Sequence, residues 1–158
     1  MSKFSHLDDQ NRPAMVDVGD KQATERQAHA RSVVNLPPEV LAELEGDEIS
    51  TRKGPVFATA IIAGVMAAKK THELIPFCHP LGLESCKISV EVESGRAIVD
   101  CRCRVHHKTG VEMEALTAAT VAALTVYDMV KAVDRGTTIT DVRLVHKDGG
   151  KSGEYRAS

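Results

Sequence analysis

A cysteine and a histidine, Cys78 and His79, lie between two prolines, Pro76 and Pro80. Proline fixes its own φ, lacks a backbone donor and pushes the residue before it toward extended backbone. The sequence therefore predicts a stiff, non-helical corner that presents a thiol and a titratable imidazole. Such a corner either ends a helix or holds a site, and the residues elsewhere in the chain decide which.

An aspartate and a lysine, Asp128 and Lys131, are three residues apart in an expected helix, so they share one face. A solvated surface ion pair is the ordinary interpretation. The almost uncharged helical turns before them favour burial instead, where an unpaired charge would be costly. A buried pair could exchange protons near neutral pH, because its surroundings shift the pKa of both groups.

Three further residues are weak signals when taken alone. Lys53 stands before Gly54 and Pro55 at an expected helix start, where a lysine opposes the helix dipole, although an ordinary loop lysine explains it better. Glu112 and Glu114 flank Met113 at a loop-to-helix junction, and in extended backbone both would face one pocket. Acidic residues are also favoured at a helix N-terminus, which is the simpler explanation.

The glycine-rich tail KDGGKSG, residues 147–153, resembles a phosphate loop but is not a Walker A motif. Val145 stands where that motif needs glycine, and no helix follows. Lys147 and Lys151 could close over phosphates, whereas a solvated chain end is the interpretation that spacing favours.

The cysteines and histidines suggest a metal site only weakly, because their spacing is not that of zinc ligands. Cys101 and Cys103 lie on the apolar face of an expected strand, so core packing explains them better than ligation. A metal-binding protein using Cys78, His79 and the hairpin cysteines and histidines is therefore the weakest of three hypotheses.

These residues must be positioned by alternating strands and helices. We expect strands over residues 24–36, 86–93, 97–105 and 137–147, helices over 39–45, 56–71 and 113–134, a turn at 94–95 and a polar loop over 47–53. One antiparallel sheet with long helices packed on one face accounts for this order, a ferredoxin-like α+β fold. The polar second face and the apolar helices suggest burial by neighbouring subunits.

Composition narrows the class of protein. The 158 residues fit a single domain, 1–158, with flexible ends over 1–20 and 148–158. A net charge of -2 and only 3% aromatic residues argue against a nucleic-acid partner. We find no apolar run that predicts a membrane span or a signal peptide, and the four cysteines form no CxxC pair, so we expect a cytoplasmic protein.

Long blocks of the chain resemble the MoaC family of cyclic pyranopterin monophosphate synthases. The blocks are VFATAIIAGVMAAKKTHELIPFCHPLGL, KTGVEMEALTAATVAALTVYDMVKAV, GGKSGEY and MVDV near the start, and they span residues 15–155. The resemblance implies a lyase of molybdenum-cofactor biosynthesis. It would convert 3′,8-cyclo-7,8-dihydroguanosine 5′-triphosphate to cyclic pyranopterin monophosphate and release pyrophosphate.

The resemblance also implies roles for individual residues. Asp128 matches the catalytic acid/base, and Lys53 and Lys131 match the lysines that move protons with it. The substrate-binding matches are Phe77, Cys78, His79, Glu112, Met113, Glu114, Arg26, Lys147 and Lys151. A homohexamer, a trimer of dimers with sites at subunit interfaces, is expected. No cofactor is firmly implied, although Mg²⁺ could accompany the triphosphate.

Two expectations remain open from the sequence. In the enzyme hypothesis, the Asp128–Lys131 pair is hidden from solvent and faces Lys53 of a partner subunit across a shared cleft. In the alternative, the chain is a non-catalytic, oligomeric nucleotide-binding or regulatory module, and the same pair is structural.

Overall fold

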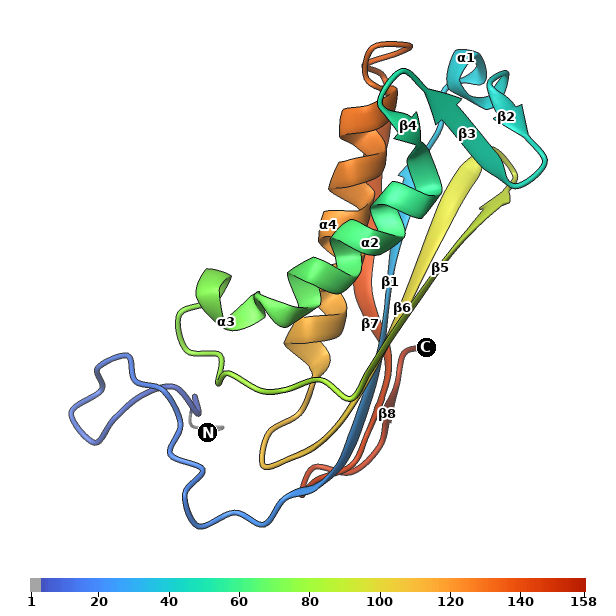
Figure 1. Ribbon diagram of the computed structural model, residues 1–158. Helices are drawn as coiled ribbons and strands as arrows, with labels where there is room; N and C mark the ends of the chain where they lie inside the picture. Colours follow the sequence, from blue (N-terminus) through green and yellow to red (C-terminus); the bar gives the residue numbers. More distant parts are fainter. Residues whose placement is uncertain (1–3) are drawn as a thin grey trace.

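Two long helices cover one face of a five-stranded antiparallel sheet in the computed structural model, which describes residues 4–158 (Figure 1). The strand order is β5-β6-β1-β7-β8, and every neighbouring pair is antiparallel. The strands are β1 (Thr24–Asn35), β5 (Ser85–Glu93), β6 (Arg96–His107), β7 (Thr138–Asp148) and β8 (Tyr155–Arg156). The ferredoxin-like α+β prediction is thereby confirmed.

The period-two pattern of the hairpin places its side chains as predicted. On β6 the apolar positions Ala97, Val99, Cys101, Cys103 and Val105 are all buried, and the arginines between them are exposed. Successive strand residues point to opposite faces of a sheet. One face of the hairpin therefore packs under the helices and the other carries charge.

The helix layer consists of α2 (Val56–Lys69), the short α3 (Thr71–Leu74) and α4 (Glu112–Val130). Small residues allow α2 and α4 to approach closely. A Cβ added at Gly64 of α2 would lie 2.5 Å from Ile88 Cδ1 and 3.1 Å from the Ala118 carbonyl oxygen of α4. By length and composition α4 could also cross a membrane, but half of that stretch is buried within the fold.

The segment between β1 and α2 differs from the prediction. The helix expected over residues 39–45 is a shorter α1 (Pro38–Leu41), followed by β2 (Leu44–Glu45). The polar loop expected over 47–53 contains β3 (Glu48–Thr51), which pairs with β2 and with β4 (Gly54–Pro55) in a second, three-stranded sheet.

Two side chains of β3 explain this small sheet. Ile49 is fully buried in the core. The Glu48 carboxylate accepts hydrogen bonds from the backbone N–H groups of Phe57 and Ala58, at 2.8 and 3.0 Å. Because the first N–H groups of a helix lack intrahelical partners, this contact caps α2. The single apolar residue of β3 gave no periodic signal in the sequence.

The helix expected over residues 113–134 ends earlier, at Val130, and Asp134 then accepts a 2.6 Å hydrogen bond from the Gly136 N–H in a turn. In the expected flexible tail, β8 pairs with His146 and Lys147. Residues 1–3 of the expected N-terminal flexible segment lie outside the described residues. The mobility of both ends and the single-domain assignment remain predictions.

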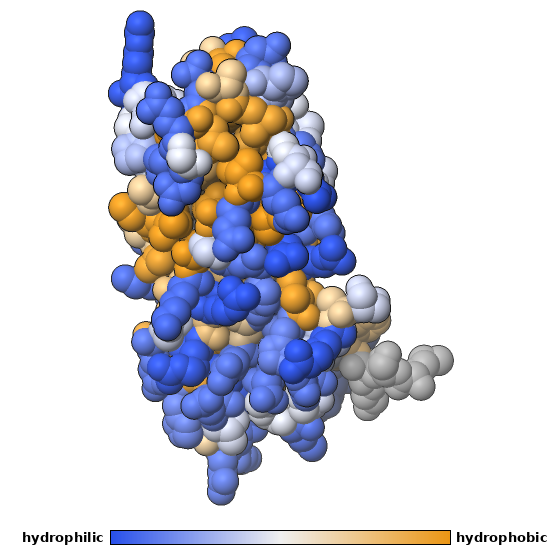
Figure 2. Space-filling view, turned by 90° about the vertical axis from the view of Figure 1, so that its right-hand side faces the viewer, coloured by the Kyte–Doolittle hydropathy of each residue, from blue (hydrophilic) through white to orange (hydrophobic). Residues whose placement is uncertain are grey.

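Large apolar side chains are exposed on the helix layer, among them Ile62, Met66 and Leu124. Figure 2 views the molecule from the right-hand side of Figure 1 and shows apolar side chains gathered over its upper part and hydrophilic ones over its lower part. The described chain therefore presents both an uncovered apolar surface and a strongly polar one.

Candidate functional site

The structure brings Lys53, Asp128 and Lys131 together at one end of the molecule. Lys53 lies in the turn between β3 and β4, Asp128 in the last turn of α4, and Lys131 directly after that helix. One carboxylate oxygen of Asp128 is 2.8 Å from Lys53 Nζ and the other is 2.7 Å from Lys131 Nζ. The carboxylate therefore bridges two ammonium groups.

Hydrogen bonds from Lys131 and Lys53 lower the pKa of Asp128 to about 2. The group is consequently a carboxylate at neutral pH and has no proton to supply. Lys53 also lines a cavity of about 650 Å³ next to the cluster. A negative group held between two positive ones can balance the charge that develops when a proton moves.

The predicted environment of this cluster is wrong in one respect, the origin of Lys53. The Asp128 side chain is 52% exposed in the single chain, so its burial against a partner subunit stays a prediction. Lys53 reaches it from the same chain rather than from a partner, because the β3–β4 turn folds over the end of α4. The three residue types meet as expected, but in one protomer and at its surface.

A second group of predicted residues surrounds a cavity of about 300 Å³ at the other end of α4. Its predicted members are Arg26, Phe77, Cys78, His79, Glu112, Met113 and Glu114. The FCHP corner follows α3, and the residues of the second motif form the loop and first turn of α4. The two motifs thus share one pocket although the sequence separates them.

The FCHP corner is held by specific contacts. His79 Nε2 donates a 2.7 Å hydrogen bond to the carbonyl oxygen of Val16, which fixes the orientation of the ring. The Cys78 thiol lies 3.5 Å from Glu114 Oε1. Burial, with the charge of Glu114, raises the pKa of Cys78 to about 11. This thiol is therefore protonated and unsuited to act as a nucleophile.

Glu114 is the most unusual group in this pocket. It is 2% exposed, and its Oε2 atom has no hydrogen-bond partner among the residues that the structure describes. Burial raises the pKa of this carboxyl above its usual value. A buried carboxyl group with an unmatched oxygen, directed at a cavity, is a candidate proton donor or a contact for a substrate hydroxyl or amine.

Basic groups gather beside the same cavity. Arg26 donates to the Lys108 carbonyl oxygen at 3.2 Å, and Lys108 Nζ donates to the Gly19 carbonyl oxygen at 2.7 Å. Lys147 lies 3.7 Å from Glu112 and is mostly buried. Lys108 was missed in the sequence, although it directly precedes the TGVEME block that lines the same pocket.

The glycine-rich tail packs against this basic group. A Cβ at Gly149 would lie 2.1 Å from the backbone carbonyl oxygen of Glu25, the residue before Arg26, and both Gly149 and Gly150 have left-handed backbone, at φ +96° and +79°. Glycine is therefore required for the close approach. Lys147 Nζ contacts the Ser152 hydroxyl, whereas Lys151 is exposed and is not among the residues that line the cavity.

The two groups of candidate residues are far apart within one chain. At about 1.5 Å per helical residue, the segment from Glu112 to Asp128 spans about 24 Å. Figure 1 shows the two ends of α4, with the β3–β4 turn at one end and the loop after α3 toward the other. One small-molecule substrate therefore cannot contact both groups of the same protomer.

The metal hypothesis finds little support in the donor groups. Within residues 4–158, no three His, Cys, Asp or Glu side chains come together in an arrangement that could hold a metal ion. Cys101 and Cys103 are buried in the core, and Cys103 Sγ is 3.8 Å from Cys86 Sγ. Packing accounts for these thiols.

Comparison with known proteins gives one consistent result. Residues 15–150 match the model of the MoaC family. The chain is 50% identical over 152 residues to the cyclic pyranopterin monophosphate synthase of Xanthomonas axonopodis pv. citri (strain 306), covering 95% of this chain and 92% of the relative. It is 51% identical to the protein of the same name from Xanthomonas oryzae pv. oryzae (strain MAFF 311018), with the same coverage. This chain belongs to the MoaC family.

Proposed function

We propose that this protein is a cyclic pyranopterin monophosphate synthase. It would convert 3′,8-cyclo-7,8-dihydroguanosine 5′-triphosphate to cyclic pyranopterin monophosphate with release of pyrophosphate. The relatives that are half identical to it carry that name. The observation that supports the proposal most directly is the bridged Lys53–Asp128–Lys131 cluster, because ring opening, ring closure and phosphate cyclisation all require positioned proton transfer.

The residues of the cluster suit that chemistry. The carboxylate of Asp128 can accept a proton, and the two ammonium groups beside it can donate one or neutralise a developing negative charge. Displacement of pyrophosphate also builds negative charge on the leaving oxygens, which cationic side chains stabilise. We assign Asp128, Lys53 and Lys131 as the catalytic residues on these grounds.

The pocket at the other end of α4 suits substrate binding. Arg26, Lys108 and Lys147 offer charge-assisted hydrogen bonds to a triphosphate. His79 and Glu114 line the same cavity and can contact the guanine-derived ring. We propose that any Mg²⁺ enters with the triphosphate, whose oxygens are ligands of the kind that Mg²⁺ prefers.

We further propose that each active site forms between two chains. The catalytic cluster of one protomer would meet the substrate-binding pocket of its partner, because the two lie about 24 Å apart along α4 of a single chain. The exposed apolar residues Ile62, Met66 and Leu124 give the helix layer a surface suited to a second copy. A homohexamer, a trimer of dimers, follows from the family resemblance, as does a cytoplasmic location that suits four free thiols.

Turnover of purified protein tests this function. The wild type, incubated with the cyclised dihydro-GTP, should release pyrophosphate and give a fluorescent pterin after oxidation. Asp128→Ala, Lys53→Ala and Lys131→Ala should each abolish both signals with an unchanged circular dichroism spectrum, while Lys70→Ala, an exposed lysine outside the cluster, should retain them. Tight binding of the substrate without either product would favour the non-catalytic nucleotide-binding alternative.

A further inference from the structure

A row of basic side chains crosses the sheet on the face away from the helices. Lys87 of β5 pairs in register with Arg102 of β6, Arg102 pairs with His29 of β1, and His29 pairs with His146 of β7. Residues directly opposite one another in antiparallel strands point to the same face. Their chain neighbours Ala28 and Cys103 are buried beneath the helix layer, so the row faces outward.

This row lines a cavity of about 480 Å³. That volume lies in the range of about 300–1,000 Å³ that is usual for small-molecule sites. Two further arginines, Arg104 and Arg156, line the same cavity, and among the described lining residues there is no Asp, Glu, Phe, Tyr or Trp. The composition favours a compact anion over a flat, apolar ring system.

Most of these cations already have a carboxylate partner. Arg104 is 3.0 Å from Glu84, and Glu154 lies 2.8 Å from His146 and 2.6 Å from Arg156.

Two of the lining side chains, which lie opposite each other on β5 and β6, have no such partner in the described part of the chain. Lys87 and Arg102 are exposed, and no ion pair joins either one to a carboxylate within residues 4–158. Like charges directly opposite each other destabilise a pair of strands. A bound anion between the two would remove that repulsion.

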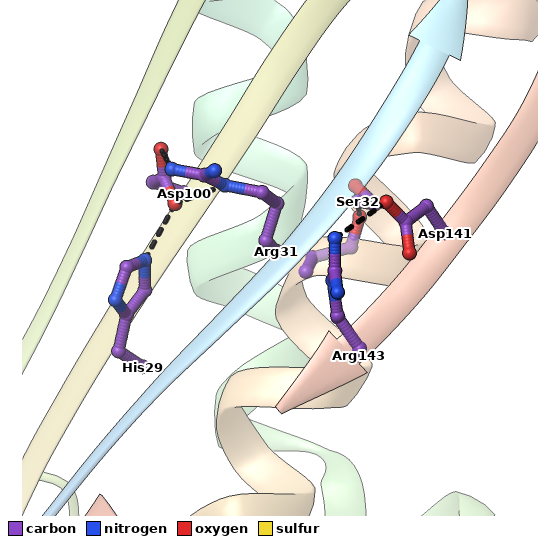
Figure 3. Close-up of polar contacts among 7 residues, drawn as sticks. His29, Arg31, Ser32, Asp100, Asp141 and Arg143 are labelled. Atoms are coloured by element: carbon purple, nitrogen blue, oxygen red, sulfur yellow. Dashed lines mark hydrogen bonds and ion pairs between the residues drawn. The ribbon is translucent and has the colours of Figure 1, made fainter. Parts of the chain in front are cut away.

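One of the lining side chains, His29, is held by a carboxylate beside the cavity. Asp100 is largely buried and accepts two hydrogen bonds from Arg31, both at 2.9 Å, and one contact from His29 Nε2 at 2.5 Å. Figure 3 shows these three side chains grouped on β1 and β6. Asp100 thereby orients His29 next to Arg102 without lining the cavity itself. A site built on paired strands holds its ligand groups more firmly than one built on loops.

We propose that this cavity is a second anion site, which binds inorganic polyphosphate or the phosphate chain of a nucleotide through Lys87 and Arg102. The Arg102 guanidinium can hold two phosphate oxygens at once, and Lys87 adds a compact positive charge. The site is separate from the proposed active site, because it lies on the opposite face of the sheet. Its side chains alternate along the strands with those of Ala28 and Cys103, which are buried under the helices. Release of pyrophosphate by the proposed reaction would supply one ligand of this class.

Isothermal titration of the full chain with pyrophosphate, tripolyphosphate, GTP and guanosine tests the proposal. The three phosphate compounds should show two classes of site per chain, and guanosine should not occupy the second class. Preference for tripolyphosphate or for GTP identifies the source of the phosphate chain. In Lys87→Gln/Arg102→Gln the second class should weaken by about tenfold or more, as expected when charge-assisted hydrogen bonds are removed.

Matched variants separate this site from the proposed active site. Lys147→Ala should weaken the first class alone, and Arg96→Gln, an exposed arginine outside both cavities, should change neither. Lys87→Gln/Arg102→Gln should retain pyrophosphate release from the cyclised substrate. Unchanged binding of the phosphate compounds by the double variant would overturn the proposal. A changed oligomeric mass of the double variant in light scattering would also overturn it, because a second copy of the chain would then cover this face. Failure of turnover in the wild type would contradict only the proposed function.

Discussion

Replacing Glu114 by glutamine changes the side chain of the substrate-binding pocket whose burial is least favourable for stability. The carboxyl is 2% exposed and one of its oxygens lacks a hydrogen-bond partner among the described residues. Glutamine has nearly the same shape and can still accept the Cys78 thiol contact, but it cannot ionise. The substitution therefore removes the charge and leaves the packing in place.

The sign of the effect follows from the pKa of Glu114, which burial raises in the folded chain. In the unfolded chain a glutamate ionises near pH 4.3 or so, about its ordinary value. Above that pH the folded state holds more protons than the unfolded state, so the free energy of unfolding falls as pH rises through the raised pKa. Glu114→Gln removes this fall. The glutamine amide leaves the same position unpaired at every pH but carries no charge. Since a buried charge without a partner costs at least about 1–3 kcal/mol, the variant should gain about that much relative to wild type at pH 8 and little at pH 4.

Urea denaturation at several pH values between about 4 and 8 measures this difference directly. Glu112→Gln is the matched control: its side chain is 32% exposed and lies near Lys147, so its removal should give no such pH-dependent gain. The same Glu114→Gln protein should bind the cyclised substrate more weakly, because an amide replaces a carboxyl group that lines the substrate-binding pocket. A variant destabilised equally at all pH values would refute the reasoning, since the carboxyl would then be paired.

Three further outcomes are expected. Gly64→Ala should lower the free energy of unfolding by about 1–3 kcal/mol in urea, because its Cβ would meet Ile88 at 2.5 Å and this crowding exceeds the helix-propensity gain. Ser32→Ala should cost about 1 kcal/mol in the same assay, because the buried Ser32 Oγ donates a 2.8 Å hydrogen bond to the Ala119 carbonyl oxygen. Asp128→Asn should lower kcat by about 10²–10⁴-fold with an unchanged melting temperature. In the wild type, the pH profile of kcat/KM should show no step from Asp128 above about pH 4, because the pKa of Asp128 is about 2.

The sequence predicted the parts of the fold whose side chains repeat. The alternation around Ile88 and Val99 defined both strands of the hairpin, and the run of small residues in α2 indicated a closely packed helix. These patterns arise because one face of each element must be buried, so burial leaves a readable period in the residue types.

The three-stranded sheet and the position of Lys53 beside Asp128 gave no periodic pattern in the sequence. Strand β3 buries only Ile49, and the contact between Lys53 and Asp128 joins residues 75 positions apart. Asp128 was expected to be hidden because the turns before it are apolar. Leu124, one turn earlier on the same face, is itself 53% exposed, so that face of α4 is open in the single chain. Residue type alone does not reveal which face of an apolar helix is uncovered.

The candidate residues were found largely through the long blocks shared with the MoaC family, and the structure explains why local signals were insufficient. Arg26 and Glu112 line one cavity, and Lys147 lies 3.7 Å from Glu112, only because β1, β7 and α4 meet. Taken singly, each has an ordinary explanation as a surface charge. Their proximity is a property of the tertiary fold.

Subunit complementation tests the central claim most directly, namely that two chains build each active site. Asp128→Ala and His79→Ala proteins, each inactive alone, are mixed, unfolded and refolded together, and pyrophosphate release from the cyclised dihydro-GTP is measured. In a symmetric dimer a mixed pair retains one intact composite site of two, so random mixing should restore about a quarter of wild-type activity. Activity that stays at the level of the separate variants, in mixed dimers verified by mass spectrometry, would contradict the account.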